Sequence, residues 1–201
     1  MPESMIEESL KNDGYVIIDD FLYPEVVDEL YESAVNCDYI DDDYSKWGYH
    51  SINFGMEKGF PFTVLPDVIN AIHGAFSPLH PLEFDRGWAF VYNNEAVGVT
   101  PHADPASVNV NLWVTPNNYI KDPTKNGLII YDKKPPEDWT WMEYNSDETR
   151  VREYLKEVNA TPRFIPYNYN RIILFDSKYF HKTNGVSTVD GRRVNYTFMF
   201  K

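Results

Sequence analysis

The sequence has a single cysteine, few basic residues and no long apolar run. Its only cysteine among 201 residues is Cys37, so an internal disulfide cannot form, and we expect this side chain to be a small apolar packing residue. Lysine and arginine number 18 against 31 aspartate and glutamate residues, which gives a net charge of -13 at pH 7. This acidic balance argues against binding a nucleic-acid backbone or an anionic membrane surface.

Segments that would direct the chain to a membrane or out of the cell are also missing. No apolar stretch reaches the length of a membrane span. Residues 1–14 are acidic and polar, whereas a signal peptide begins with basic residues and an apolar core. Together with the low cysteine content, these absences predict a cytoplasmic protein.

Aromatic and strand-forming residues are what the chain has in excess. Aromatic residues make up 16% of the sequence, which favours a strand-rich, well-packed interior. Hydrophobic spacing predicts helices over residues 24–35, 65–76 and about 147–158, and mostly loop with one strand over residues 36–62. Strand-like runs separated by turn-forming residues cover residues 15–21, 84–94, 107–115, 127–132, 163–168, 171–177 and 192–200.

This order of elements predicts an α+β, mainly β, single domain over residues 1–201. Residues 1–80 would form a supporting region of helices and loops, and residues 84–201 a barrel or two-sheet jelly roll interrupted by an insertion at 133–160. The insertion carries two tryptophans in the stretch Trp139-Thr140-Trp141. A long loop of this kind can act as a substrate lid, or its tryptophans can simply close the end of the barrel.

The stretch TPHADPAS places His102 and Asp104 two residues apart after an apolar run. On a strand, residues i and i+2 point to the same face, so the imidazole and the carboxylate can approach one point. A metal site, an acid–base pair and an ordinary strand end all remain open on these two residues alone.

A third metal ligand would have to come from a distant strand, and the chain has five histidines. We expect His73 and His80 to be structural or surface residues, while His50 could line a pocket or be exposed. His181 follows the strand-like run RIILFDSKYF and precedes a turn-rich loop, so it sits at a strand exit. Two histidines and one carboxylate form a facial triad, which suits non-haem Fe(II) and leaves three coordination positions open.

The last strand, RRVNYTFMF, begins with two arginines. On a strand Arg192 and Arg193 face opposite ways, and Arg193 shares its face with the more polar residues Asn195 and Thr197. An arginine near a metal can clamp a free carboxylate with two parallel hydrogen bonds. The pattern therefore points to a cosubstrate that is a carboxylic acid, with Arg193 as the clamp.

Taken in order, His102-Ala103-Asp104, His181 and Arg193 resemble the HxD…H…R pattern of the 2-oxoglutarate and Fe(II)-dependent oxygenases. The segment GYVIIDDFLYPEVVDELYESA (14–34) resembles the opening strand and helix of the prolyl-hydroxylase-like branch. WAFVYNNEAVGVTPHAD (88–104) and NGLIIYDKKPP (126–136) resemble the strands before and after the first ligands.

This resemblance implies a double-stranded β-helix (jelly roll) with N-terminal helices packed on one sheet. It implies that His102, Asp104 and His181 bind Fe(II) and act in catalysis, that 2-oxoglutarate is the cosubstrate, and that O2 takes the last metal position. Arg193 would hold the far carboxylate, with Thr197 as a helper; Tyr92 would contact the cosubstrate or be a core aromatic. Asn111 either lines the polar pocket or lies on an exposed face.

The implied activity is that of a dioxygenase that hydroxylates a C–H bond and releases succinate and CO2. The carboxylate of Asp104 favours hydroxylation, or a desaturation or demethylation that begins in the same way, over halogenation, since halogenating relatives have a small residue at that position. The substrate would be peptidyl, an amino acid or a small metabolite. Two rival readings are a cupin-like metal enzyme with different chemistry and a non-catalytic jelly-roll binding module; neither the substrate nor the oligomeric state follows from the sequence.

Overall fold

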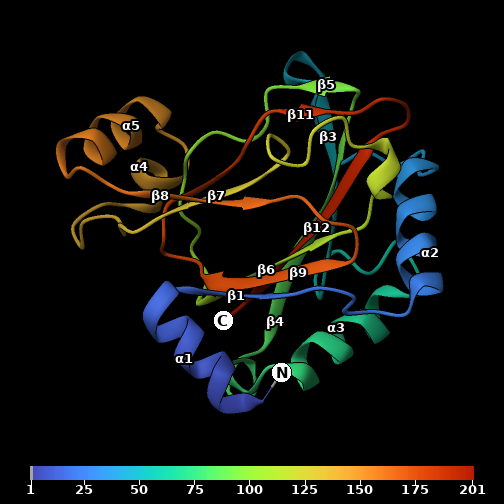
Figure 1. Ribbon diagram of the computed structural model, residues 1–201, viewed down its shortest axis with the longest axis horizontal. Helices are drawn as coiled ribbons and strands as arrows, with labels where there is room; N and C mark the ends of the chain where they lie inside the picture. Colours follow the sequence, from blue (N-terminus) through green and yellow to red (C-terminus); the bar gives the residue numbers. More distant parts are fainter. Residues whose placement is uncertain (1) are drawn as a thin grey trace.

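The fold is a pair of facing antiparallel sheets, described for residues 2–201 by a computed structural model (Figure 1). The larger sheet has seven strands in the order β1-β9-β6-β12-β4-β3-β2. Its strands are β1 (Tyr15–Ile18), β2 (Asp42–Tyr44), β3 (Tyr49–Gly55), β4 (Phe84–Tyr92), β6 (Val108–Trp113), β9 (Arg171–Asp176) and β12 (Arg193–Phe200). The smaller sheet has the order β10-β7-β8, from β7 (Gly127–Tyr131), β8 (Pro162–Pro166) and β10 (His181–Thr183).

Two short strands, β5 (Glu95–Ala96) and β11 (Val186–Ser187), pair with each other in a separate ribbon. Single 3₁₀ turns complete the regular structure: η1 (Ser45–Trp47), η2 (Ser77–Leu79) and η3 (Asn117–Tyr119). The two facing sheets and their antiparallel pairing are those of a jelly roll, which confirms the mainly β fold class.

Strand β12 lies at the centre of the larger sheet, between β4 and β6. Its outward residues Val194, Tyr196 and Phe198 are buried in the main apolar core, and the Tyr196 hydroxyl donates to the Leu30 carbonyl oxygen at 2.7 Å. The alternate residues, beginning with Arg193, face the smaller sheet. Successive side chains of this strand thus point alternately into the apolar core and into the interior of the jelly roll.

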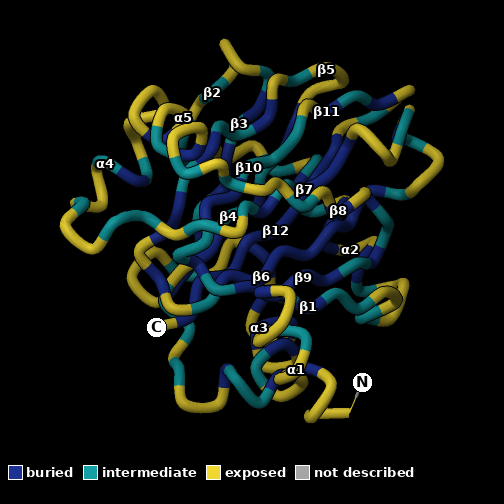
Figure 2. The backbone as a smooth tube through the Cα atoms, turned by 60° about the vertical axis from the view of Figure 1, so that its left-hand side comes forward, coloured by how far each residue is buried: buried dark blue, intermediate teal, exposed yellow. Residues whose placement is uncertain are grey.

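Three helices cover the outer face of the larger sheet (Figure 1): α1 (Glu3–Asp13), α2 (Pro24–Val35) and α3 (Leu65–Ala75). Helix α2 begins with Pro24 in its first turn and buries residues at helical spacing, among them Val27, Leu30 and Ala34. Both α2 and α3 lie within one residue of the ranges predicted from sequence. The residues of the central strands are mostly buried, while these helices have exposed residues on the side away from the sheet (Figure 2).

The insertion between β7 and β8 forms two helices, α4 (Trp141–Asn145) and α5 (Glu148–Glu157), at one end of the sheets (Figure 1). Asp147 caps α5 by accepting a hydrogen bond from the Arg150 backbone N–H at 3.0 Å. Thr140 and Glu143 form a capping box at the start of α4. The predicted loop before residue 147 is therefore partly helical.

Residues 36–62 contain more strand than predicted, because both β2 and β3 belong to the larger sheet. Strand β3 alternates residues such as Ile52, which is fully buried, with polar ones such as Ser51 and Asn53, so its composition reads as loop. Helix α1 was also not predicted, because its sequence is mostly polar and only Ile6 is buried. Within residues 2–201, no helix has the length and apolarity needed to cross a membrane.

The close approach of β7 and β8 gives a test of the smaller sheet. A Cβ at Gly127 would collide with the carbonyl oxygen of Ile165 in β8, whereas a Cβ at Gly74, on the exposed side of α3, would meet no atom within 4 Å. Gly127→Ala should lower the free energy of unfolding by about 1–3 kcal/mol, since the two backbones must separate. Gly74→Ala should raise it by up to about 1 kcal/mol. Denaturant titration of both variants measures these free energies of unfolding. Equal stability of Gly127→Ala and the unaltered protein would contradict the close packing of β7 and β8.

Candidate metal centre

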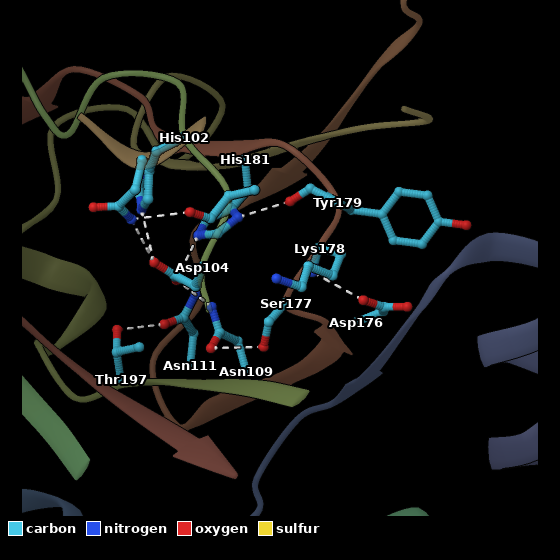
Figure 3. A network of polar contacts seen from close by, with 12 residues as sticks. His102, Asp104, Asn109, Asn111, Asp176, Ser177, Lys178, Tyr179, His181 and Thr197 are labelled. Carbon is cyan, nitrogen blue, oxygen red and sulfur yellow. Dashed lines mark hydrogen bonds and ion pairs between the residues drawn. The ribbon is translucent and has the colours of Figure 1, made fainter. Parts of the chain in front are cut away.

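His102, Asp104 and His181 converge on one point inside the jelly roll (Figure 3). One ligand atom from each lies within 4.8 Å of the other two. The Nε2 atom of His102 is 3.8 Å from Asp104 Oδ1, and Nε2 of His181 is 3.3 Å from Asp104 Oδ2. Two imidazoles and one carboxylate at these separations can bind one divalent transition metal, as the sequence spacing predicted.

The backbone brings the two halves of this site together. His102 and His181 exchange backbone hydrogen bonds of 3.0 and 2.8 Å in an isolated antiparallel bridge. The Asp104 N–H donates to the Ser177 carbonyl oxygen at 2.9 Å. The HxD segment is therefore held against the chain that links β9 to β10, although 79 positions separate the two histidines in the numbering.

Hydrogen bonds select the tautomer of each imidazole. His102 Nδ1 lies 2.7 Å from the Thr100 carbonyl oxygen, and His181 Nδ1 lies 2.9 Å from that of Tyr179. A carbonyl oxygen can only accept, so each Nδ1 carries the proton. Each Nε2 is then left with its lone pair free toward Asp104, which is the form a metal requires.

Two asparagines hold the carboxylate of Asp104. The side-chain amide of Asn109, in β6, donates to Asp104 Oδ2 at 2.5 Å, and that of Asn145, in α4, donates to Oδ1 at 3.1 Å. Ser177 donates to Asn109 Oδ1 at 3.0 Å and so orients that amide. The sequence reading missed Asn145, which lies 41 positions from Asp104 in the helical insertion. The insertion therefore reaches the metal centre itself.

Burial and charge shift the pKa values of Asp104 and His102. Burial favours the neutral form of Asp104, but the neighbouring imidazoles of His102 and His181 and the hydrogen bond from Asn109 outweigh it, lowering its pKa to about 2. Burial, followed by the proximity of His181, lowers the pKa of His102 below its ordinary value. An ionised carboxylate beside a neutral imidazole at neutral pH is what metal binding needs.

Arg193 is a buried cation without an anion. Its side chain is 1% exposed, and Nε and Nη1 have no hydrogen-bond partner among the described residues. The guanidinium carbon lies 5.2–5.6 Å from the ring centres of Tyr92, Trp113 and Tyr167. Aromatic rings lessen the cost of burying the charge but leave its N–H groups unsatisfied. A planar carboxylate would satisfy them. Arg192, which was expected on the apolar face that packs against the helices, is instead exposed, because it precedes the first residue of β12.

Two more buried polar atoms near Arg193 lack partners. Tyr92 stands directly opposite Arg193 in the β4–β12 register, and its hydroxyl has no hydrogen bond within residues 2–201. The Oδ1 atom of Asn195, two residues beyond Arg193 on the same face, is in the same condition. A ligand bound beside Arg193 would complete the hydrogen bonds of both atoms. Asn195 was not among the predicted site residues, although its spacing from Arg193 is a usable signal.

A cavity of about 410 Å³ opens beside the metal ligands. Asn111 and Thr197 lie in its wall, and the Thr197 hydroxyl donates to Asn111 Oδ1 at 2.6 Å. Arg193 and Tyr92 are buried next to this wall rather than in it. The wall is made up of Asp42, Tyr44, Tyr49, Ser51, Asp85, Arg86, Trp88, Phe90, Val99, Thr100, His102, Asp104, Pro105, Asn111, Leu128, Trp141, Asn145, His181, Thr183, Asn195, Thr197, Met199 and Lys201.

The two tryptophans of the insertion have different surroundings. Trp141 lines the cavity and is 53% exposed, as a residue over a substrate entrance would be. Trp139 instead packs against Tyr154 and Phe180, with ring centres 5.2 and 6.4 Å away. The packing of Trp139 agrees with tryptophans that close the end of the barrel, while a lid role for Trp141 stays a prediction.

The remaining histidines lie away from the centre. His73 Nε2 is 3.1 Å from the Leu82 carbonyl oxygen, which is a structural contact, and its ring lies beside that of His80, which is exposed at the surface. His50 lies half-buried in β3 and is not part of the cavity wall.

Comparison with known proteins relates the chain to a fold rather than to a sequence family. No protein-family model matches it, and no curated protein does. The epimerase SnoN from nogalamycin biosynthesis, a non-heme alpha ketoglutarate dependent enzyme, matches with a TM-score of 0.72 at 13% identity, over 98% of this chain and 82% of that one. HygX from Streptomyces hygroscopicus, with nickel and 2-oxoglutarate bound, matches with a TM-score of 0.67 at 10% identity, over 100% and 87%.

A prolyl hydroxylase from Trichoplax adhaerens, in complex with a hypoxia inducible factor oxygen degradation domain peptide fragment, matches with a TM-score of 0.62. The identity is 15%, over 98% of this chain and 88% of that one. The fold of the chain is therefore the jelly roll of the 2-oxoglutarate and Fe(II)-dependent oxygenases, prolyl hydroxylases among them. The resemblance noted in the sequence is confirmed at the level of fold.

The hydrogen bond from Asn145 to Asp104 should tune metal affinity. Asn145→Ala removes one of the two amide donors, so we expect the dissociation constant for Co(II) or Ni(II) to rise by about 10-fold or more. Trp141→Ala is the control, because it alters the same helix and the cavity wall but no contact of Asp104. Calorimetric metal titration measures both. Unchanged affinity in Asn145→Ala would show that Asn145 does not orient the ligand.

Proposed function

We propose that the protein is an Fe(II)- and 2-oxoglutarate-dependent oxygenase that hydroxylates a C–H bond of a substrate held in the cavity. The observation that carries this proposal is the buried, unpartnered guanidinium of Arg193 behind a His–Asp–His centre. Burying a guanidinium without an anion costs free energy, and a bound anion would offset that cost.

The donor set supports Fe(II) as the metal. His102, Asp104 and His181 supply two imidazole nitrogens and one carboxylate, and the preset tautomers leave both Nε2 atoms available. The absence of a fourth protein ligand among the described residues agrees with a site that leaves positions for small molecules. HygX, which shares the fold, has nickel and 2-oxoglutarate bound.

A dicarboxylic keto acid suits the remaining groups. Its keto-acid end would bind the metal, while Arg193 would donate hydrogen bonds to its far carboxylate, with Tyr92 and Asn195 supplying further polar contacts. Asn111 and Thr197 form a polar wall between these two ends of the site. The rigid central strands β6 and β12 carry four of these five residues, and such support keeps a binding geometry precise.

Iron and cosubstrate, when bound, supply the oxidation of a C–H bond by O2 with release of succinate and CO2. The protein's own residues hold and orient the reactants. The three ligands fix the metal, and Arg193 fixes the cosubstrate. The walls of the cavity exclude water from the reacting centre, with Trp141 at the entrance. Because Asp104 occupies the carboxylate position, we propose hydroxylation rather than halogenation.

The partners remain predictions from composition and cavity size. A cavity of about 410 Å³ accepts a small molecule or one side chain of a peptide. One neighbour in fold binds a peptide fragment, and another belongs to nogalamycin biosynthesis. The acidic net charge of -13 disfavours a nucleic-acid substrate. A cytoplasmic location stays the expectation from the sequence.

The cofactor assignment can be tested without knowing the substrate. Under anaerobic conditions, Fe(II) and 2-oxoglutarate should give the visible charge-transfer band of the chelate. His181→Ala should abolish the band, since it removes a metal ligand. Arg193→Gln should raise the 2-oxoglutarate concentration needed for half the band by more than 10-fold, because it removes the charged partner of a buried carboxylate.

Arg192→Gln is the matched control, with the same change of charge at the exposed residue that directly precedes β12. It should leave the band and its concentration dependence unaltered. A metal-loaded protein that gives no band would support the cupin-like alternative. Failure to bind metal at all would support a binding module.

A further inference from the structure

The end of the cavity away from the metal has its own chemical character. Strands β2, β3 and β4 form this end, and they contribute Asp42, Tyr44, Tyr49, Ser51, Trp88 and Phe90 to the wall. The register of the sheet runs Asp42–Ser51–Phe90–Asn195 across four adjacent strands. Asp42 is therefore three strand spacings, roughly 14 Å along the sheet, from the polar wall beside Arg193.

The cavity wall has three carboxylates. Asp85 pairs with cations and Asp104 belongs to the candidate metal centre, whereas Asp42 does neither. Its Oδ2 atom accepts hydrogen bonds from Ser51 Oγ at 3.2 Å and from Asn53 Nδ2 at 3.1 Å. In the part of the chain that the structure describes, no lysine, arginine or histidine nitrogen lies within 4.0 Å of it. The nearby Lys58 is paired with Asp41 instead, at 2.7 Å.

The two basic residues of the cavity wall both pair with another carboxylate, Asp85, and not with Asp42. Arg86 Nε and Lys201 Nζ each lie 2.8 Å from Oδ2 of Asp85. Asp104 belongs to the metal centre. Outside the metal centre, the wall therefore has one net positive charge at the Asp85 cluster in β4 and the C-terminus, and one negative charge at Asp42 in β2.

Aromatic rings surround the approach to this carboxylate. The ring centres of Tyr44 and Tyr49 are 4.9 Å apart, those of Tyr49 and Phe90 are 6.1 Å apart, and those of Phe90 and Trp88 are 6.4 Å apart. All four rings line the cavity. The faces of such rings attract an organic cation, and a carboxylate among them adds a charged hydrogen-bond acceptor.

We propose that this end of the cavity binds a protonated amine of the substrate, with Asp42 as the residue that determines specificity. The proposal rests on the proposed function, because the metal centre defines where oxidation takes place. The amine then lies several bonds away from the oxidised carbon, at the opposite end of the molecule. The same ammonium group can belong to a small metabolite or to a lysine side chain.

Binding of matched amines and amides tests the proposal without iron or turnover. The probes are phenethylamine, glucosamine and the peptide acetyl-Ala-Lys-Ala-amide, each compared with its N-acetylated form, which lacks the positive charge. Ligand-detected NMR titration measures their affinities for the unaltered protein, for Asp42→Asn and for Asp43→Asn. Asp43 is the control, because it carries the same charge on the same strand but is exposed.

In at least one pair the amine should bind the unaltered protein at least 10-fold more tightly than the amide. Asp42→Asn should reduce this preference to within about twofold, and Asp43→Asn should retain it. A preference in the sugar or phenethylamine pair identifies a small metabolite; one in the peptide pair alone identifies a lysine side chain.

Three results would overturn the proposal: no probe binds, amine and amide bind equally, or both variants change the preference alike. The cofactor experiment is independent of these outcomes. A chelate band without amine binding would refute the role of Asp42 alone, whereas amine binding without a band would refute the oxygenase assignment alone.

Discussion

The burial of the Arg193 guanidinium is the constraint on which the interior of the molecule depends. A charged group withdrawn from water costs several kcal/mol unless other groups compensate. Here three aromatic rings enclose it, yet Nε and Nη1 have no partner in residues 2–201. A bound anion, as proposed for the cosubstrate, would compensate this cost. The hydroxyl of Tyr92 and the amide oxygen of Asn195 lack partners in the same region.

Strand β12 carries Arg193 together with residues of the apolar core and of the cavity wall. Its outward face anchors the helices through Tyr196 and Phe198, while its inward face carries Arg193, Asn195 and Thr197. Neighbouring β6 supplies Asn109, which holds the metal ligand Asp104, and Asn111, which binds Thr197. Two adjacent strands thus position both ends of the proposed cosubstrate. Because they are hydrogen-bonded to each other, the distance between the ends is set by the sheet and not by mobile loops.

Residue patterns predicted the features that depend on local order. The alternation in RRVNYTFMF predicted which arginine faces inward, and the HxD spacing predicted that His102 and Asp104 share a side. The proline and apolar spacing of α2 gave its bounds correctly. Residues 36–62 were expected to contain one strand and contain two, β2 and β3, because polar residues such as Ser51 interrupt the apolar pattern of a strand that lines a cavity. Helix α1 was missed because it buries only Ile6.

Contacts between segments far apart in the sequence were beyond such reasoning. Nothing near Asn145 indicates that it donates to Asp104, since the two meet only when the insertion folds back over the HxD segment. The place of Asp42 opposite the metal centre likewise follows from the order of strands in the sheet, which the sequence does not state. The residue types predicted a metal site and a bound carboxylate. The positions of Asn145 and Asp42 relative to that site could be found only from the tertiary structure.

The central claim is that Arg193 holds a carboxylate. The most direct measurement compares two acids on the unaltered, Zn(II)-loaded protein by calorimetry: 2-oxoglutarate, and 2-oxopentanoate, which has a methyl group in place of the far carboxylate. If Arg193 binds that carboxylate in a buried pair, 2-oxoglutarate should bind at least about 100-fold more tightly, corresponding to roughly 2.7 kcal/mol. Equal affinities of the two acids would contradict the account.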